Sequence, residues 1–220
     1  MNVLVVAAHP DDELLGVGGT IASHIAKGDR VKVAVMCEGV SSRYNGDWDV
    51  EVRKQANQAA QILGVVDLVL GNLPDQRLDT VPLCDVVKKV EQLIADSQPN
   101  VVYTHFAGDI NRDHKILTEA VLVAARPYSA PSVKEVLMFE TPSSTEWGSA
   151  TLTPPFHANV YVDVTDFLEQ KIRAFSCYSA EVRPCPHPRS LEALADRARY
   201  WGSMINRRCA EAFALVRSTR

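Results

Sequence analysis

Two clusters of histidines and carboxylates in this chain have the residue types that bind metal ions and move protons. The first, HPDDE (9–13), directly follows an apolar run, and the second, HFAGDINRDH, spans residues 105–114. Two histidines and one carboxylate with an open fourth position form a catalytic zinc site, and a carboxylate beside it can act as general base. Asp11 and Asp12 suggest a division of these tasks, because successive side chains in a turn diverge.

Ordinary structural roles are alternatives for both clusters. A carboxylate pair in front of a helix often caps its N-terminus, and a single buried histidine is often only a hydrogen-bonded core residue. The presence of two such clusters, each after an apolar run, favours the metal site. The glycines of GVGGT (16–20) follow Ala8 by eight residues, behind acids that would repel a pyrophosphate, so they do not predict a dinucleotide site. We expect them to let a helix pack closely on a sheet, or to line the floor of a cleft.

The elements that must position these clusters alternate between short apolar runs and segments of helical period. The expected strands are 2–8, 31–37, 66–71, 100–105 and 133–139, with a short sixth at 158–164. The expected helices lie between Leu14 and Gly28, over 51–63, around Val86–Ile94, over 113–126, and over about 165–180 and 190–215. This alternation predicts an α/β fold, with a mostly parallel sheet, helices on both faces and a C-terminal helical elaboration.

The order of these elements predicts where the two clusters lie. In an open α/β sheet, ligands bind beyond the carboxyl ends of the strands. If strands 2–8 and 100–105 are near the middle of the sheet, the loops after them face each other across one cleft. We expect a single domain over 1–220, made of an α/β core (1–139) and a C-terminal part (140–220).

Composition excludes several classes of partner. The chain has 220 residues, a formal net charge of −4 and 46% hydrophobic residues. It has no run rich in lysine and arginine, which argues against nucleic-acid or acidic-membrane partners. The first apolar run is too short for a signal peptide or a membrane span, so we expect a cytoplasmic protein without membrane insertion. The five cysteines lack CxxC spacing, and we expect reduced, buried thiols at 37, 84, 177, 185 and 209.

The two clusters resemble motifs of the PIG-L / LmbE-like zinc-dependent deacetylases, which include N-acetylglucosaminyl-phosphatidylinositol and chitobiose deacetylases. The resemblance rests on HPDDELLGVGGT and THFAGDINRDH, with weaker support from VRKQANQAAQILGV, LPDQRLD, HPRS and AEAF. It implies a Rossmann-like fold and an amide hydrolase that removes the acetyl group of an N-acetylated amino sugar or its conjugate. It also implies Zn²⁺ held by His9, Asp12 and His114, with Asp11 as general base. The same ligand set suits other divalent ions.

Asn111 departs from the pattern of many family members, which carry a histidine at this position. An asparagine amide can donate a hydrogen bond but cannot supply a proton near neutral pH. The general acid is therefore open between protonated Asp11, His105 and His187. The sequence resembles the branch with a THxxxDxNxDH motif, so Asn111 does not by itself indicate an inactive protein.

Further side chains are candidates for supporting the site or binding substrate. Asp113 either orients His114 or caps its helix, and Glu13 either caps a helix or supports the metal ligands. Trp147 and Trp201 either stack on sugars or pack internally. The candidates for contacts with substrate are Arg53, Asp75, Arg77 and Arg189. A solvated helix face for Arg53 and a turn for Asp75 and Arg77 are the ordinary alternatives.

Two other functions fit the same residues. One is an amidase acting on a larger sugar conjugate, which only the shape of a pocket formed by 40–50, 72–80 and 140–157 would distinguish. The other is a non-catalytic module that binds a metal or a nucleotide sugar. The expected partner is a small acetamido-sugar, free or linked to a nucleotide or lipid. The resemblance also implies a homo-oligomer, for which we expect contacts within 140–220.

Overall fold

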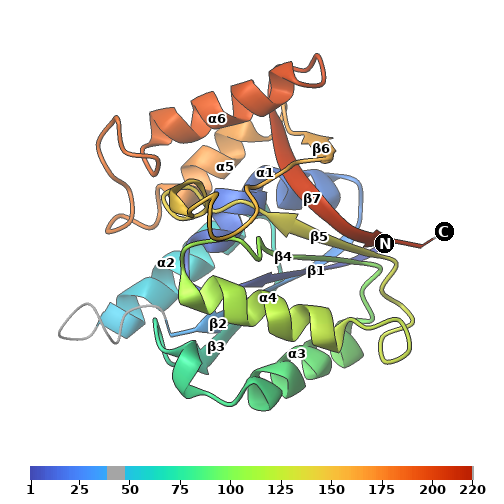
Figure 1. Ribbon diagram of the computed structural model, residues 1–220. Helices are drawn as coiled ribbons and strands as arrows, with labels where there is room; N and C mark the ends of the chain where they lie inside the picture. The colour runs from blue at the N-terminus through green and yellow to red at the C-terminus, as the bar shows by residue number, and fades with distance from the viewer. Residues whose placement is uncertain (39–47, 220) are drawn as a thin grey trace.

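A computed structural model describes residues 1–38 and 48–219, within which seven strands form one sheet in the order β3-β2-β1-β4-β5-β7-β6 (Figure 1). Strands β1 to β5 are parallel, and β7 runs antiparallel to both β5 and β6. The strands are β1 (Asn2–Ala7), β2 (Arg30–Cys37), β3 (Asp67–Leu73), β4 (Val101–His105), β5 (Glu135–Phe139), β6 (Val160–Asp163) and β7 (Ala210–Ser218). The α/β fold with a mostly parallel sheet is confirmed.

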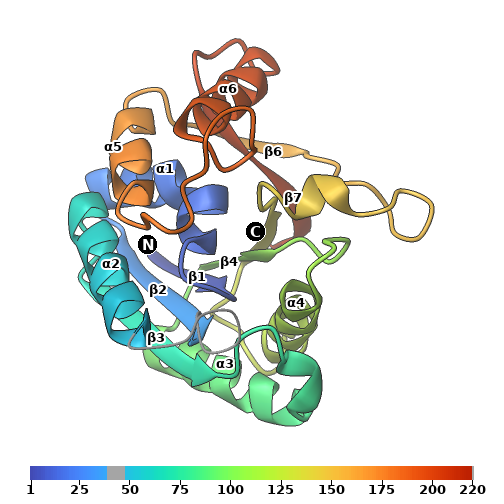
Figure 2. The same cartoon turned by 90° about the vertical axis from the view of Figure 1, so that its left-hand side faces the viewer.

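Helices cover both faces of this sheet, with α1, α2 and α5 on one side and α3 and α4 on the other (Figure 2). The helices are α1 (Asp12–Ala26), α2 (Trp48–Leu63), α3 (Leu83–Ser97), α4 (Arg112–Ala124), α5 (Leu168–Phe175) and α6 (Leu191–Ser203). Strand β1 serves both cores because successive side chains point to opposite faces: Val3 and Val5 pack with the first group, Leu4 and Val6 with the second. This double burial explains why its sequence is continuously apolar.

The two clusters of histidines and carboxylates, at 9–13 and 105–114, lie next to each other, as expected. Strands β1 and β4 pair directly, with Val3 opposite Val101 and Val5 opposite Tyr103. Their carboxyl ends therefore lie side by side, and the segments after Ala7 and His105 leave the sheet at the same edge. The position of both strands inside the sheet confirms the arrangement expected from the sequence.

The C-terminal part differs from the prediction. The expected helix over about 190–215 is wrong beyond Ser203, because α6 ends there and the chain turns through Asn206 at φ 55°. Residues Ala210–Ser218 instead form β7, which fills the space between β5 and β6. The expected helix over 165–180 is also shorter, spanning only Leu168–Phe175.

Helix α1 lies against the sheet at its glycines, as predicted. A Cβ on Gly16 would stand 2.2 Å from Cδ2 of Phe139 in β5, and a Cβ on Gly19 would stand 2.9 Å from Cβ of Val164. Larger side chains here would push the helix off its neighbours. The close approach fixes the position of the N-terminus of α1, where Asp12 is the first helical residue.

A buried ion pair also contacts the middle of α1. Lys171 of α5 donates to the backbone oxygen of Leu15 at 3.0 Å and to Oε1 of Glu211 in β7 at 2.6 Å. Glu211 in turn accepts from the backbone N–H groups of Gly19 (2.9 Å) and Thr20 (2.7 Å). In a regular helix the Gly19 N–H pairs with the Leu15 oxygen, so this Lys171–Glu211 pair engages both partners of one helical bond.

The cysteines are less buried than expected. Cys37 and Cys209 are buried, but Cys84 and Cys185 are exposed and Cys177 is intermediate, so the expectation of five buried thiols is wrong for three of them. Among the helices of the described residues, none combines the length and hydropathy that a bilayer crossing needs.

Candidate metal site

Three side chains converge at the carboxyl edge of β1 and β4. They are His9 and Asp12, from the turn after β1 and the start of α1, and His114 from the first turn of α4. His9 Nδ1 lies 3.2 Å from Asp12 Oδ2, His114 Nε2 lies 3.2 Å from the same oxygen, and the two ring nitrogens are 3.3 Å apart. We call these residues the imidazole triad, which is the predicted set of metal ligands.

The imidazole triad fits a divalent cation. Neighbouring ligands of a tetrahedral zinc with bonds of about 2.0–2.1 Å are separated by about 3.3 Å, close to the separations found here. Asp12 is 1% exposed, and its second oxygen, Oδ1, has no hydrogen-bond partner among the described residues. Because buried carboxylate oxygens are almost always paired, this oxygen indicates a missing positive partner.

His9 is oriented by a carboxylate behind it. Its Nε2 lies 3.0 Å from Asp113 Oδ2 and 3.5 Å from Asp75 Oδ1, which leaves Nδ1 facing Asp12 and His114. Burial acts to lower the pKa of His9, but the hydrogen bonds to Asp113 and Asp12 outweigh it and raise the pKa to about 10. The metal-free site therefore holds a proton on His9 that a cation has to displace.

Asp113 does not orient His114, contrary to one of the two roles expected for it, and it does not cap α4 either. The carboxylate beside the other nitrogen of the His114 ring is Asp109, whose Oδ1 lies 3.3 Å from Nδ1. Hydroxyls of Ser144 and Thr145 donate to Asp109 and hold it in place. Burial opposes the charged form of Asp109, but these contacts keep the pKa of its carboxyl below the usual range.

Asp11, the predicted base, sits in an unusual backbone conformation just before α1. Its φ is 114°, a region that non-glycine residues rarely adopt. Glu13 holds this turn by accepting from the Asp11 N–H at 3.0 Å, while Tyr178 donates to the other Glu13 oxygen at 2.8 Å. Burial raises the pKa of Glu13 to about 7. Glu13 therefore contacts the backbone of the predicted base, and its expected support of the metal ligands stays a prediction.

Arg189 reaches Asp11 from the loop between α5 and α6. Its Nη1 donates to Asp11 Oδ2 at 2.9 Å and to Glu181 Oε2 at 2.6 Å, and its Nε donates to Ser143 Oγ at 2.7 Å. Burial raises the pKa of Asp11 well above its usual range even though the guanidinium opposes this shift. A carboxyl group with a raised pKa is suited to proton transfer near neutral pH.

His105 lies in the protein interior beside His114. It is fully buried, its Nε2 accepts from the Ala8 N–H at 2.9 Å, and its Nδ1 lies 3.0 Å from Thr141 Oγ1. Its ring stacks on that of His114 with centroids 3.9 Å apart. Burial lowers the pKa of His105 well below its usual range, so the ring is neutral. Since both ring nitrogens are engaged, His105 is unsuited to protonate a substrate.

Asn111 caps α4, which gives this residue a structural reason to be an asparagine. Its Oδ1 accepts from the Asp113 N–H at 2.9 Å, and its Nδ2 donates to Gln76 Oε1 at 3.3 Å. Gln76 Nε2 lies 3.1 Å from His9 Nε2, so Asn111 connects to the imidazole triad through one intervening side chain.

The other acid candidate, His187, lies on the loop that carries Arg189. Its Nδ1 accepts from the Arg189 N–H at 3.0 Å, so the neutral ring carries its proton on Nε2. The ring meets the edge of Trp147, which is 55% exposed, at a centroid distance of 6.0 Å. Trp201 instead donates to Glu140 Oε1 at 2.5 Å, as expected for a packing residue.

The expected substrate contacts are spread over several places. Arg189 contacts Asp11, and Asp75 is buried beside His9. Arg53 donates to the backbone oxygen of Gly71 at 3.1 Å, which ties α2 to β3. Arg77 is exposed. Of the pocket segments expected to shape specificity, residues 40–47 lie outside the described residues.

Several functional neighbours were not singled out from the sequence. Asp109 lies inside the quoted motif THFAGDINRDH, so its carboxylate type was a usable signal. Gln76 lies in LPDQRLD, but nothing in its spacing indicates contact with His9. Glu181 and Cys37 join the site only through the fold, because no local pattern relates them to HPDDE.

Comparison with known proteins assigns a family to this chain. A model of the PIG-L family, described as GlcNAc-PI de-N-acetylase, matches residues 4–125. A deacetylase of Escherichia coli K12, YaiS, described as uncharacterized, is 30% identical over 148 residues, covering 65% of this chain and 75% of that protein. A probable N-acetyl-alpha-D-glucosaminyl L-malate deacetylase 2 of Bacillus anthracis is 23% identical over 189 residues, covering 82% of this chain and 81% of that protein.

A solved structure shows the same fold. The zinc-inhibited form of the teicoplanin deacetylase Orf2 superposes with a TM-score of 0.80 at 19% identity, covering 99% of each chain. The likeness therefore extends over the C-terminal region that follows the family match.

Proposed function

The chain belongs to the PIG-L family, and from this premise we propose that it is a divalent-metal-dependent deacetylase of an N-acetylated amino sugar or its conjugate. The observation that carries the proposal is the imidazole triad, with its buried and unpaired Asp12 oxygen beside the proton-accepting Asp11. The names of the family and of the Bacillus relative support the acetamido-sugar substrate.

The imidazole triad would hold the cation, for which zinc is the first choice. A bound divalent ion supplies Lewis acidity, which acidifies water and polarises an amide carbonyl. Asp113 and Asp109 fix the rings of His9 and His114, so that one nitrogen of each faces Asp12. The set of two imidazoles and one carboxylate also suits other divalent ions, so the metal has to be identified by titration.

Asp11 would take the proton from the attacking water and return it to the leaving amine. Burial raises the pKa of Asp11, which makes its carboxylate a stronger base for the first transfer, and the protonated carboxyl group can return the proton in the second. Arg189 would hold the carboxylate of Asp11 in position through Oδ2. His187 is the second candidate for the acid, since it lies two residues from Arg189 and carries its proton on Nε2.

The test is release of free amine from a panel of N-acetylated amino sugars, including glucosamine conjugates with malate and with inositol. Fluorescamine detects the amine, and protein treated with a chelator is the control. We expect turnover that is lost on chelation and restored by one divalent ion per chain. Metal binding without turnover of any panel member would favour the non-catalytic alternative.

Two substitutions test the assigned roles. Asp11→Asn should lower kcat by about 10²–10⁴-fold while the metal affinity stays within about threefold, because an amide cannot accept the proton. His187→Ala should lower kcat by less than about tenfold if Asp11 is also the acid. A larger loss in His187→Ala than in Asp11→Asn would transfer the acid role to His187.

A further inference from the structure

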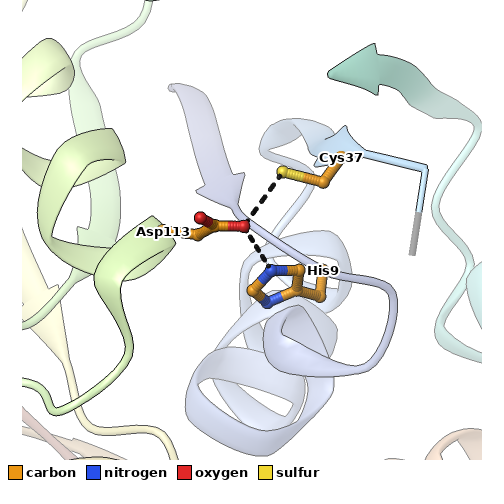
Figure 3. Close-up of side chains that lie close together, drawn as sticks. All are labelled: His9, Cys37 and Asp113. Atoms are coloured by element: carbon orange, nitrogen blue, oxygen red, sulfur yellow. Dashed lines mark hydrogen bonds and ion pairs between the residues drawn. The ribbon is translucent and has the colours of Figure 1, made fainter. Parts of the chain in front are cut away.

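A second group of metal-binding side chains lies on the opposite edge of the His9 ring. His9, Cys37 and Asp113 each place one donor atom within 4.8 Å of the others, and we call them the thiol triad. Figure 3 shows Asp113 between the other two, with one oxygen directed to the sulfur and to the ring. Asp113 Oδ2 lies 3.0 Å from His9 Nε2 and 3.9 Å from Cys37 Sγ.

The three residues come from different elements that the fold brings together. Cys37 is the last residue of β2, His9 follows β1, and Asp113 begins α4. Cys37 is 2% exposed and Asp113 is 1% exposed, so neither is a surface group that meets cations by chance. The other Asp113 oxygen accepts from the Leu78 N–H at 3.0 Å, which fixes the carboxylate in place.

The charges around this position favour a cation. A second buried carboxylate, Asp75, places Oδ1 3.5 Å from the same His9 nitrogen. Thiolate sulfur and imidazole nitrogen are ligands of zinc and of softer ions, whereas magnesium and manganese prefer oxygen. The thiol triad thus differs in ligand type from the imidazole triad, which contains no sulfur.

We propose that the thiol triad is a second metal site, selective for soft divalent cations, that competes with the imidazole triad for His9. Binding there displaces the Cys37 thiol proton and the His9 Nε2 proton to solvent, and leaves Nδ1–H to donate to Asp12 Oδ2, 3.2 Å away. With a cation on Nδ1, the ring instead keeps its Nε2 proton on Asp113. One neutral imidazole serves one site at a time, so a soft cation in the thiol triad opposes filling of the imidazole triad.

The experiment uses metal-free protein titrated with Cd²⁺, and it does not depend on deacetylase activity. The accessible thiols are first replaced in a background variant, Cys84→Ser/Cys177→Ser/Cys185→Ser, which retains Cys37. Thiolate-to-cadmium charge-transfer absorbance reports sulfur ligation, and equilibrium dialysis counts the bound ions. Adding Cys37→Ser, or Cys37→Ala as a second variant, removes the proposed sulfur ligand.

We expect the background protein to develop the charge-transfer band and to bind one Cd²⁺ per chain. Both Cys37 variants should lose the band but still bind one Cd²⁺ through the imidazole triad. Adding His114→Ala to the background should preserve the band, and Asp113→Asn should weaken the Cd²⁺ affinity about tenfold or more.

Three results would overturn the proposal. A band that survives in both Cys37 variants would assign the sulfur ligand elsewhere. Cadmium bound to the background protein without a band would show that Cys37 is only a buried packing residue. Two cadmium ions per chain together with the band would show that the two sites do not share His9. Circular dichroism and thermal unfolding of each variant confirm that these comparisons are made between folded proteins.

Discussion

Two buried polar clusters lie against helix α1, and they differ in whether every polar atom has a hydrogen-bond partner. At its N-terminus, the imidazole triad leaves Asp12 Oδ1 without a hydrogen-bond partner among the described residues. In its middle, the Lys171–Glu211 pair has a partner for each charged atom, and the helix backbone supplies three of these partners. Both clusters are almost completely buried, so burial alone does not distinguish them.

This difference in pairing distinguishes a structural ion pair from a ligand-binding site. When a buried polar group is fully paired, its hydrogen bonds within the protein offset the cost of removing it from water, and they stabilise one arrangement of the chain. A buried carboxylate oxygen without a partner is stabilised only when something else binds. On this criterion the Lys171–Glu211 pair fixes α1 against α5 and β7, and the imidazole triad is left for a ligand.

The largest expected effect is a loss of folding stability when the Lys171–Glu211 pair is broken. Lys171→Met should lower the free energy of unfolding by about 3–5 kcal/mol, because Glu211 would remain buried without its cation. Arg199→Met, at the exposed pair with Asp196, should change it by less than about 0.5 kcal/mol. Urea unfolding measures both, and equal effects would contradict the comparison. Adding Glu211→Gln to Lys171→Met should recover part of the loss, since the amide oxygen still accepts from the helix.

A smaller effect is expected at the metal ligands. Asp109→Asn should weaken metal affinity about 10–100-fold, because the neutral amide no longer favours the ring orientation of His114. A competition titration against a chromophoric chelator measures this change. Asp29→Asn is the matched control, since Asp29 bonds His24 at 2.7 Å and neither residue belongs to the imidazole triad. An unchanged affinity in Asp109→Asn would show that Asp109 is only part of the local packing.

The third effect is a dependence on pH. The pKa of His9 is raised to about 10 in the metal-free fold, above an unfolded value of about 6.5. His9 therefore stabilises the metal-free protein fully below pH 6.5, and this contribution is lost as the pH rises through 10. Since the metal must displace that proton, affinity should rise up to about tenfold per unit between pH 7 and 9. Calorimetry in buffers of different ionisation enthalpy should count one proton from His9, and no proton release would contradict this assignment.

The sequence predicted the strands correctly where the local hydrophobic pattern matches the burial that the fold gives them. Continuous apolar runs predicted β1, β2, β4 and β5 because these strands pack into the cores on both faces of the sheet, and they also predicted β3, an edge strand that is mostly half-buried. It failed at Ala210–Ser218, whose Ala, Glu and Leu residues favour a helix in isolation. There, pairing with β5 and β6 overrides the local preference, and Glu211 is needed inside the protein for Lys171.

The candidate site was predictable in its ligand types but not in its supporting contacts. HPDDE and the Asp113–His114 pair indicate the proposed metal ligands by residue type, and the sheet order brings these side chains together. Side-chain direction at the start of α4 decides that Asp113 faces His9 while Asp109 faces His114. The contact from Arg189 to Asp11 joins residues 178 positions apart, which no local pattern reveals.

The wide separation of these residues along the chain has a consequence for the protein's synthesis. His9 and Asp12 leave the ribosome long before His114, which lies 105 positions after His9, so the emerging segment offers only part of the imidazole triad. The ligands meet only after β4 has paired with β1. Arg189 completes the surroundings of Asp11 later still. Metal capture should therefore be a late event in biosynthesis, and a nascent chain truncated before α4 should emerge without the ability to take up its ion.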